Sequence, residues 1–591
     1  MEFRKHGVNL ILMFVLALVF LYVGLVVTFF LVNSLPGDIA LCFLPPVYSP
    51  AEYQAVVQML GLNDPLFFRF LRYIGEFISV DWGISCSVSA GAPVSVLLND
   101  RFPRSIEFLS LPLLIGINLG FVFGKISKRT KHNWLKMGIR LLSAVGIAIP
   151  VFVFGMYLQY TLAFQADMFP AVGYKTPGYP NPPLITGFRI LDSMISGQLY
   201  LAADTILHYI LPGLVLTVAI TALMTRVFDS KFVGHSEKKK TILSNTTKTS
   251  AVFGVILTYL ILIEPTFNLH GFSSLFLSSL VQQDFFLLRG FMFMIIILYA
   301  ITIFVSNVSF TLIGIVRDKI HPPKKELKVT TEREPRISGP IEFKNFLLKI
   351  IKSPVTIIGL VLVIIPIIVS IFPELISGVS FEDVNGIWPG AWSPPSPDHP
   401  LGTAKFGRDV LAQVAYGTRN TIIFGLGAVV TGLIGGVIFG PLASKYKRIA
   451  HPITMSVMLI FYVLPGILLV LFFVSNTPGG DIFGLLMFTT GFLLIPGFTR
   501  IIANSEFRIV PIIKKVLTYV PLFTGFAILF YVPLAFLGFY DPRIISLGGL
   551  ISEGRAMMYV APWAIFWPGG IAFLIVVSLF VLHEGLVKSS R

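Results

Sequence analysis

Long apolar stretches alternate with shorter polar ones along the whole chain. A helix needs about 20 mostly apolar residues to cross the roughly 30 Å of hydrocarbon in a bilayer. Twelve stretches meet that requirement, so the pattern predicts an all-α polytopic membrane protein with about twelve transmembrane helices. The predicted spans lie at 9–33, 106–124, 139–164, 207–225, 250–268, 290–315, 354–376, 419–442, 452–474, 482–499, 516–538 and 564–585.

One polar segment, 317–352, separates the first six predicted spans from the last six. Its prolines and its charges of both signs are typical of a linker. Each group of six spans begins with a single span followed by a long outer segment, at 34–105 and at 377–418. Because an even number of spans returns the chain to the same side, this order predicts a parallel duplication, with halves at 1–316 and 353–591.

The composition supports a membrane location. Hydrophobic residues make up 55% of the 591-residue chain and charged residues only 13%, whereas soluble domains carry about 25% charged residues. The mean hydropathy is +0.83. The apolar stretches also leave no segment long enough for a water-soluble catalytic domain.

The net charge of +15 could suggest a nucleic-acid partner, but the positions of the cations argue against one. Short loops rich in Lys and Arg stay in the cytoplasm. Most of the cations fall in alternate gaps between spans, which predicts a plasma-membrane protein with both termini and the linker in the cytoplasm. These gaps are the N-terminus, 125–140, 226–248, 317–352, 445–448, 500–515 and the C-terminus.

Both cysteines of the chain, Cys42 and Cys86, lie in the first outer segment. An oxidising exterior would permit a disulfide between them. The alternative is that they are two small buried side chains, and the sequence leaves both possibilities open.

The first outer segment also contains a helix-start pattern. Ser49 is a candidate N-cap, with Pro50 at the first helical position and Glu52 in the first turn. Apolar residues then recur to Leu60 and again over 66–80, which predicts two short helices. The aromatic residues of the second stretch suit the membrane surface.

The second half carries several short motifs in order. HPLGT lies at 399–403, FGRDVL at 406–411 and YGTR at 416–419. LAFLG at 534–538 and the stretch from APW at 561–563 to PG at 568–569 follow, within or beside the last two predicted spans.

The first half carries its own ordered set. LPGD at 35–38 closes the first span, LGLNDP follows at 60–65, and RFPRSIE at 101–107 opens the second span. AIPVF at 148–152 lies in the third span and HYILP at 208–212 opens the fourth. The pattern after the fifth span consists of Glu264, Phe267, Gly271, Asp284 and Gly290.

Both sets of motifs resemble those of the dipeptide and oligopeptide ABC importer permeases, each half resembling one of the two permease subunits. The resemblance implies the type I importer fold, with a pseudo-two-fold axis along the membrane normal. It also implies two separate ATP-binding subunits, which would hold ATP and Mg²⁺, and an extracytoplasmic solute-binding protein. That protein would dock on the outer segments. The candidate docking or outer-gate residues, within or next to these segments, are Asp64, Arg408, Asp409 and Arg419. Arg408 and Asp409 could equally form a local cap and ion pair.

Ionisable residues within spans are costly and are therefore functional candidates. Three lie near the outer ends of their spans: Glu107, His208 and Glu264. Each could contact the solute or form structural hydrogen bonds. None has an evident catalytic partner within its own span, so the sequence does not predict an intramembrane enzyme.

The chain has no GxxxxGK[ST] loop to cradle nucleotide phosphates and no metal-ligand motif. The sequence therefore predicts a transporter subunit that is not an enzyme and that has no cofactor of its own. Family resemblance suggests peptides as the solute, but oligosaccharides or metal chelates stay open.

The loops that should couple to the ATPases are the least family-like parts of the chain, because both are short. Two functions from different classes remain open: a working importer, or a non-transporting scaffold or binding-protein receptor with eroded coupling loops. The candidate coupling residues are Gly234, His235, Ser236 and Glu237 in the first loop and Asn504, Ser505, Glu506 and Phe507 in the second.

Overall fold

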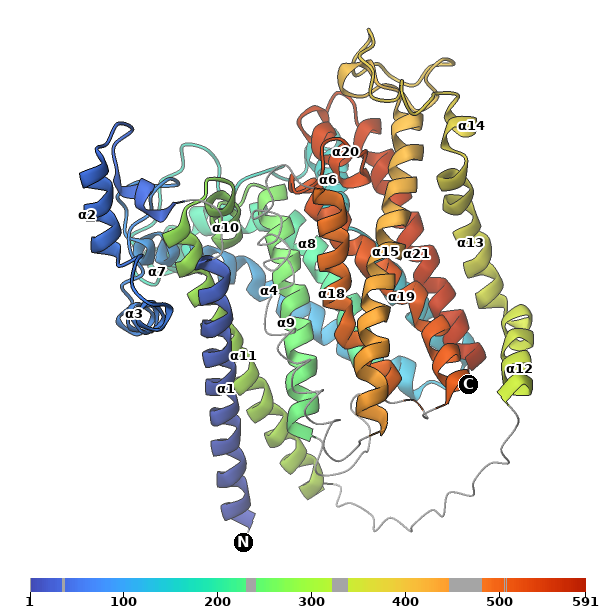
Figure 1. Ribbon diagram of the computed structural model, residues 1–591, viewed down its shortest axis with the longest axis horizontal. Coiled ribbons are helices and arrows are strands. Elements are labelled where there is room, and N and C mark those ends of the chain that lie inside the picture. The colour runs from blue at the N-terminus through green and yellow to red at the C-terminus, as the bar shows by residue number, and fades with distance from the viewer. Residues whose placement is uncertain are drawn as a thin grey trace.

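A computed structural model describes residues 2–33, 38–229, 241–320, 339–445, 481–503, 505 and 508–590. Within these ranges every extended regular element is a helix, and only two isolated β-bridges occur. The predicted all-α fold is confirmed. Long helices run side by side through the molecule, and shorter helices and loops gather at one end of them (Figure 1).

The N-terminal part of the chain begins with one long helix, continues through an outer region of short helices, and then returns to long ones. Its helices are α1 (Glu2–Asn33), η1 (Ile39–Phe43), α2 (Pro50–Leu60), α3 (Leu66–Ser79), α4 (Val94–Arg129), α5 (Asn133–Ala148), α6 (Val151–Leu158), η2 (Gln159–Gln165), α7 (Arg189–Ile195), α8 (Leu199–Asp229), α9 (Thr241–Thr266), α10 (Phe272–Val281) and α11 (Phe285–Ile320).

The C-terminal part repeats this alternation with a different outer region. Its described helices are α12 (Gly339–Lys352), α13 (Pro354–Ile371), α14 (Pro373–Ser377), η4 (Lys405–Gly407), α15 (Val410–Lys445), α18 (Ile482–Ala503), α19 (Ile509–Phe536), α20 (Leu547–Gly554), η5 (Arg555–Met557) and α21 (Trp563–Ser590).

The described helices match most of the predicted spans. Nine of them are long and apolar enough to cross a membrane, and a bent pair raises the number to ten. The fifth predicted span corresponds to a shorter apolar stretch, Val252–Thr266, at the end of α9. The span predicted at 452–474 lies outside the described residues. The chain is a multi-pass membrane protein.

The bend in the third span occurs at a proline. α5 and the helix that follows it meet at an angle of 85°, and Pro150 stands at the N-cap of α6. Proline has no N–H to continue the helical hydrogen bonding, so a span can break there. By contrast, Pro496 lies inside α18 without a break in that helix.

Glycines at intervals of four residues allow two pairs of long helices to pack closely. On α4 they are Gly116, Gly120 and Gly124, and a Cβ on Gly120 would lie 2.3 Å from the Cβ of Met224 on α8. On α15 a Cβ on Gly436 would lie 2.4 Å from the Cβ of Phe498 on α18. Small residues at this spacing let transmembrane helix backbones approach one another.

The same helix pairing occurs twice along the chain. α4 packs on α8 as α15 packs on α18, and α1 packs on α11 as α13 packs on α21. The pairs α9–α10 and α10–α11 likewise correspond to α19–α20 and α20–α21. This recurrence is what a parallel duplication produces.

The predicted helix start in the first outer segment is confirmed. The side chain of Ser49 accepts a hydrogen bond from the backbone N–H of Glu52, whose carboxylate accepts one from the N–H of Ser49. The two predicted short helices are α2 and α3. Capping of this kind satisfies amides that the first turn of a helix leaves free.

Three predicted boundaries differ in the structure. α4 begins at Val94, so the motif at 101–107 lies inside a helix instead of opening one. α15 begins at Val410, so the last part of the predicted outer segment 377–418 is helical. The last part of the predicted polar linker forms the helix α12. Phe346 of this helix is buried and holds it against its neighbours.

Candidate functional site

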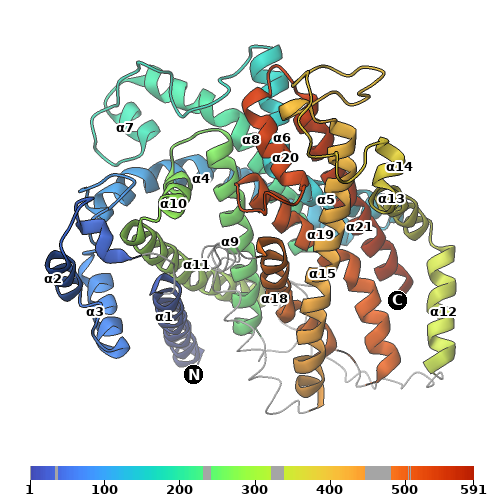
Figure 2. The same cartoon turned by 45° about the horizontal axis from the view of Figure 1, so that its top comes forward.

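A buried aromatic contact joins the two predicted halves. The rings of Phe152 on α6 and Phe536 on α19 stack with centroids 4.3 Å apart and planes 20° apart. Both side chains belong to one apolar cluster formed by α5 and α6 of the first half and α15, α19, α20 and α21 of the second. Figure 2 shows α6 near α20, and α21 also packs on α5 and α6.

A polar contact lies at the outer end of this cluster. The guanidinium of Arg555 donates to the backbone oxygen of Pro265 at 2.5 Å, and to that of Thr266. These carbonyls belong to the last turn of α9, where carbonyl oxygens lack partners within the helix. Arg555 also stands over the ring of Phe536, with its Cζ 5.7 Å from the ring centroid.

A second polar contact joins the halves at the opposite end. Arg226, in the last turn of α8, pairs with Glu584 of α21 through Nη1 and Oε1 at 2.7 Å. Arg226 also donates to Ser143 of α5. Both partners are near the ends of helices that lead toward the side on which the two termini lie (Figure 1).

The two halves are therefore joined by an apolar centre with a polar contact at each end. The described residues include no cluster of His, Cys, Asp or Glu that could hold a metal ion.

Glu264 is held by hydrogen bonds from three sides. One of its carboxylate oxygens accepts from the N–H of Ser273 at 2.8 Å and from that of Ser274, and the other accepts from the hydroxyl of Ser105. The amides belong to the first turn of α10, so the carboxylate caps that helix. A Cβ on Gly271 would lie 2.5 Å from this carboxylate, which explains why the motif has glycine there.

Glu107 and His208 each contact a backbone group. Glu107 accepts from the N–H of Ile190 at 2.7 Å, at the first turn of α7, and its other carboxylate oxygen has no partner among the described residues. His208 is buried, and its Nδ1 lies 2.8 Å from the backbone oxygen of Asp204. No hydrogen bond links any two of the three predicted solute-path residues within the described structure.

The predicted docking residues are distributed over two distant regions. Asp64 pairs with Arg72 in the corner formed by α2 and α3, far from the segment that precedes α15 (Figure 1). Arg419 is exposed on α15. Arg408 donates to the backbone oxygens of Asn385 and Gly386.

Asp409 caps α15 and pairs with a histidine. One of its oxygens accepts from the N–H of Ala412, and the other lies 2.9 Å from Nδ1 of His399. The expected partner, Arg408, instead holds the outer loop through the two carbonyls. The local-cap interpretation of Asp409 agrees with this geometry, and the side-chain partner of Asp409 is His399 instead of Arg408.

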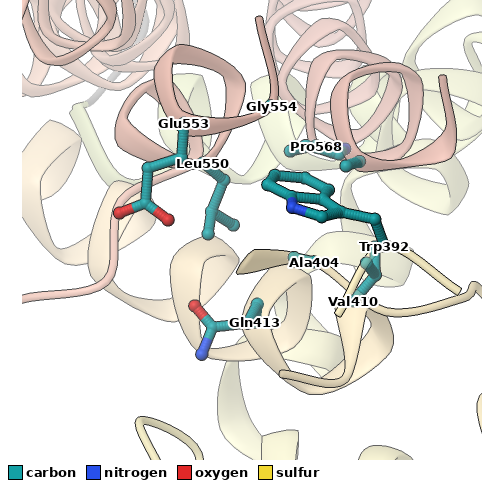
Figure 3. A pocket seen from close by; sticks show the side chains of 9 residues that line it. Trp392, Ala404, Val410, Gln413, Leu550, Glu553, Gly554 and Pro568 are labelled. Atoms are coloured by element: carbon teal, nitrogen blue, oxygen red, sulfur yellow. The ribbon is translucent and has the colours of Figure 1, made fainter. Parts of the chain in front are cut away.

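A small pocket lies in the second half, between the start of α15 and α20 (Figure 3). Trp392 and Gln413 line it opposite Leu550 and Glu553 of α20. The space available to a water-sized sphere is ≈ 10 Å³, which is room for about one water. The pocket is therefore too small for a peptide.

Both cysteines are free thiols, and they contact each other. The hydrogen bond from Cys86 lowers the pKa of the Cys42 thiol, while the same bond raises the pKa of Cys86. Asp284 fixes the loop that carries Cys86, because its carboxylate accepts from the N–H groups of Cys86, Ser87 and Val88. The structure brings the two thiols together, and the disulfide stays a prediction.

Most of the predicted coupling residues lie outside the described residues, namely Gly234, His235, Ser236, Glu237, Asn504, Glu506 and Phe507. Ser505 is described and buried. Its hydroxyl donates to the backbone oxygen of Ile501, and its own carbonyl accepts from Ser444 at the end of α15. Ser505 therefore connects the end of α18 to the end of α15 through hydrogen bonds.

The sequence interpretation missed the contacts between the halves. Arg226, Glu584 and Arg555 are charged residues at or near span ends, so the intramembrane criterion could have included them. The sequence could not show which groups these residues contact, because each partner lies hundreds of residues away. Glycines recur every four residues at 116, 120 and 124, and again at 432, 436 and 440. This spacing is visible in the sequence and predicts closely packed helices.

Comparison with known proteins agrees with this architecture. No family model matches the chain. It is 27% identical over 282 residues to the oligopeptide transport system permease protein AppB of Bacillus subtilis, an alignment that covers 44% of this chain and 83% of the relative. The dipeptide permease DppB of Lactococcus lactis is 25% identical over 276 residues, with 46% and 86% covered. The glutathione permease GsiC of Escherichia coli K12 is 25% identical over 287 residues, with 45% and 84% covered.

Each of these alignments covers most of the relative but less than half of the chain. The 591 residues therefore accommodate two such units, in agreement with the helix pairing that occurs twice. The chain is related to the dipeptide and oligopeptide ABC transport permeases.

Proposed function

We propose that the chain is a two-half membrane body of a peptide-type ABC importer, with the solute path between its two halves. The similarity to oligopeptide, dipeptide and glutathione permeases carries this proposal. The halves are residues 1–316 and 353–591, joined by a cytoplasmic linker at 317–352. Peptides are the proposed solute class, because the relatives' names refer to peptides.

The contacts between the halves suggest how the path opens. In the described structure the Phe152–Phe536 stack joins the halves, Arg555 contacts the end of α9, and Arg226 pairs with Glu584 at the other end. Alternating access requires one end to separate while the other stays closed. Breaking the Arg226–Glu584 pair would open the cytoplasmic end, and releasing Arg555 from α9 would open the outer end.

Partner subunits supply the remaining parts of this mechanism. Both termini lie on the cytoplasmic side of the plasma membrane. Two ATP-binding subunits bind on that side and supply ATP and Mg²⁺. A solute-binding protein docks on the opposite face. Arg419 is its most accessible candidate contact, since Asp64 pairs with Arg72 and since Arg408 and Asp409 hold the loop before α15.

A second function is favoured by one observation. Only five residues separate the end of α18 at Ala503 from the start of α19 at Ile509. Two turns of a separate helix need roughly seven residues, so this connection is shorter than a helix that could seat in an ATPase groove. A non-transporting scaffold, or a receptor for the binding protein, would not need such a helix.

One experiment separates the two functions. Tagged protein is purified from native membranes under mild conditions, and vesicles containing it are assayed for peptide uptake with and without ATP. An importer brings down ATP-binding subunits and shows ATP-dependent uptake. Recovery of a binding protein without any ATPase, together with no uptake, would support the scaffold or receptor instead.

A further inference from the structure

A pocket with an excess of positive charge lies where α1 ends. It is lined by the last residues of α1, the turn after α2, one face of α3 and the first residues of α11. The space available to a water-sized sphere is ≈ 80 Å³, enough for roughly five or more water-sized groups. The pocket is apart from the contacts between the halves, and nothing in the proposed transport mechanism uses it.

Three arginines line this pocket, against one carboxylate. Arg289 pairs with Glu76 at 2.6 Å, and Arg72 pairs with Asp64, which lies outside the lining. Arg69 donates to the amide oxygen of Asn33. Among the described residues no carboxylate lies within ion-pair distance of Arg69, so this guanidinium retains unused donors.

The sequence around the pocket adds no hidden acid. The four residues between Asn33 and Asp38 are Ser, Leu, Pro and Gly, none of which is charged. Asp38 itself accepts hydrogen bonds from Tyr53 and from the N–H of Ala40. The positive charge of Arg69 is thus available to a ligand.

The outward face of α3 places the pocket at the membrane surface. Phe67 is 65% exposed and Ile78 is 71% exposed, and Leu66, Phe68 and Leu71 are also exposed. Arg69, Arg72 and Glu76 lie on the opposite face of α3 and line the pocket. A helix with one apolar face and one charged face suits the lipid interface.

The packing of α3 fixes its depth. Tyr73 shares a hydrogen bond of 2.8 Å with Thr28 of α1, and Phe70 packs edge-on against Phe29 with ring centroids 5.2 Å apart. α3 therefore crosses α1 within its last turns, at the level where that span leaves the hydrocarbon. Figure 1 shows α3 running across the direction of α1.

The ligand must be an anion with an apolar part. Phe29, Val32, Phe285 and Phe286 line the same pocket as Arg69, and a guanidinium matches phosphate oxygens through two parallel hydrogen bonds. We propose that the pocket binds a phospholipid from the leaflet at this end of α1, with its phosphate on Arg69 and its chains along α1 and α11.

The test measures lipid retention by the full chain. Delipidated protein is incubated with phosphatidylglycerol, and native mass spectrometry records the fraction that carries lipid. Arg69→Gln should lower the apparent affinity about tenfold, the cost of one charge-assisted hydrogen bond. Arg69→Lys should keep most of the affinity, and Arg129→Gln, the control at an exposed arginine on α4, should match the unmodified protein.

Two results would overturn the proposal. Equal retention by the Arg69→Gln variant and the unmodified protein would show that this pocket does not hold the lipid. Calorimetric titration with inorganic phosphate alone distinguishes the source of the anion. The proposal predicts no saturable binding there, since free phosphate lacks the chains. Saturable phosphate binding that Arg69→Gln abolishes would assign the pocket to a free anion.

Discussion

Glu264 shows how a buried charge in a span can be structural. It caps the first turn of α10 and accepts from Ser105 of α4, so three helices meet at its carboxylate. In the second half Ser546 caps α20 in the corresponding place. The two halves use different side chains to cap corresponding helices.

Replacing Glu264 tests this role. Glu264→Ala leaves the amides of Ser273 and Ser274 without an acceptor, and each orphaned donor costs about 1–3 kcal/mol. The melting temperature in detergent should fall, and Glu264→Gln should fall less because it keeps one oxygen. Glu374→Ala, at an exposed carboxylate on α14, is the control. A Glu264→Ala variant with unchanged stability and lost uptake would indicate solute contact instead.

The contact between Cys42 and Cys86 leads to a chemical prediction. The lowered pKa makes the Cys42 thiolate available at milder pH, and an external disulfide compound would accept the two electrons as the S–S bond forms. Protein isolated without reductant should carry the bond. Intact mass after reduction and alkylation under denaturing conditions should then exceed that after alkylation alone by two added groups. Equal masses would exclude the bond.

At the residue scale the sequence could predict caps but not distant partners. Ser49 and Glu52 form the predicted cap because both groups lie within one turn. Asp409 caps α15 for the same local reason, but its partner His399 comes from the folding of the outer loop. Arg226 and Glu584 lie in different halves, so no local pattern could join them.

At the scale of elements, hydropathy predicted where spans run but not where helices end. The break at Pro150 followed from proline chemistry. The start of α4 at Val94 did not, because its first turns lie outside the apolar stretch and are held by packing, as where Val94 and Leu98 meet Gly290 of α11. The predicted span at 452–474 is untested by the described residues.

The glycine rows provide an element-scale prediction. Gly120→Ala should weaken the α4–α8 pair, because the added Cβ would lie 2.3 Å from that of Met224, and overpacking costs about 1–3 kcal/mol. Gly436→Ala should do the same for α15 and α18. Gly570→Ala on α21 is the matched control, since no atom lies within 4 Å of its added Cβ.

Melting temperatures in detergent would measure these effects. The variants at Gly120 and Gly436 should both melt below the unmodified protein, while the Gly570 variant should not. Equal melting temperatures for all three variants would mean that close helix approach at the two rows contributes nothing to stability.

At the scale of the whole molecule, the chain combines two units that lack an obvious repeat in sequence. The same helix pairing occurs twice: α1 packs on α11 as α13 packs on α21, and α4 packs on α8 as α15 packs on α18. The halves meet through Phe152, Phe536, Arg555, Arg226 and Glu584. The solute path proposed above lies at this interface.

Uptake with the cytoplasmic pair locked tests the central claim most directly. In a background with Cys42→Ser and Cys86→Ser, Arg226→Cys and Glu584→Cys are joined by a reducible bifunctional thiol reagent in vesicles that take up peptide with ATP. The proposed mechanism predicts that cross-linking stops uptake and that reduction restores it, whereas each single cysteine variant is unaffected by the reagent. Undiminished uptake after complete cross-linking would contradict a path that opens between the halves.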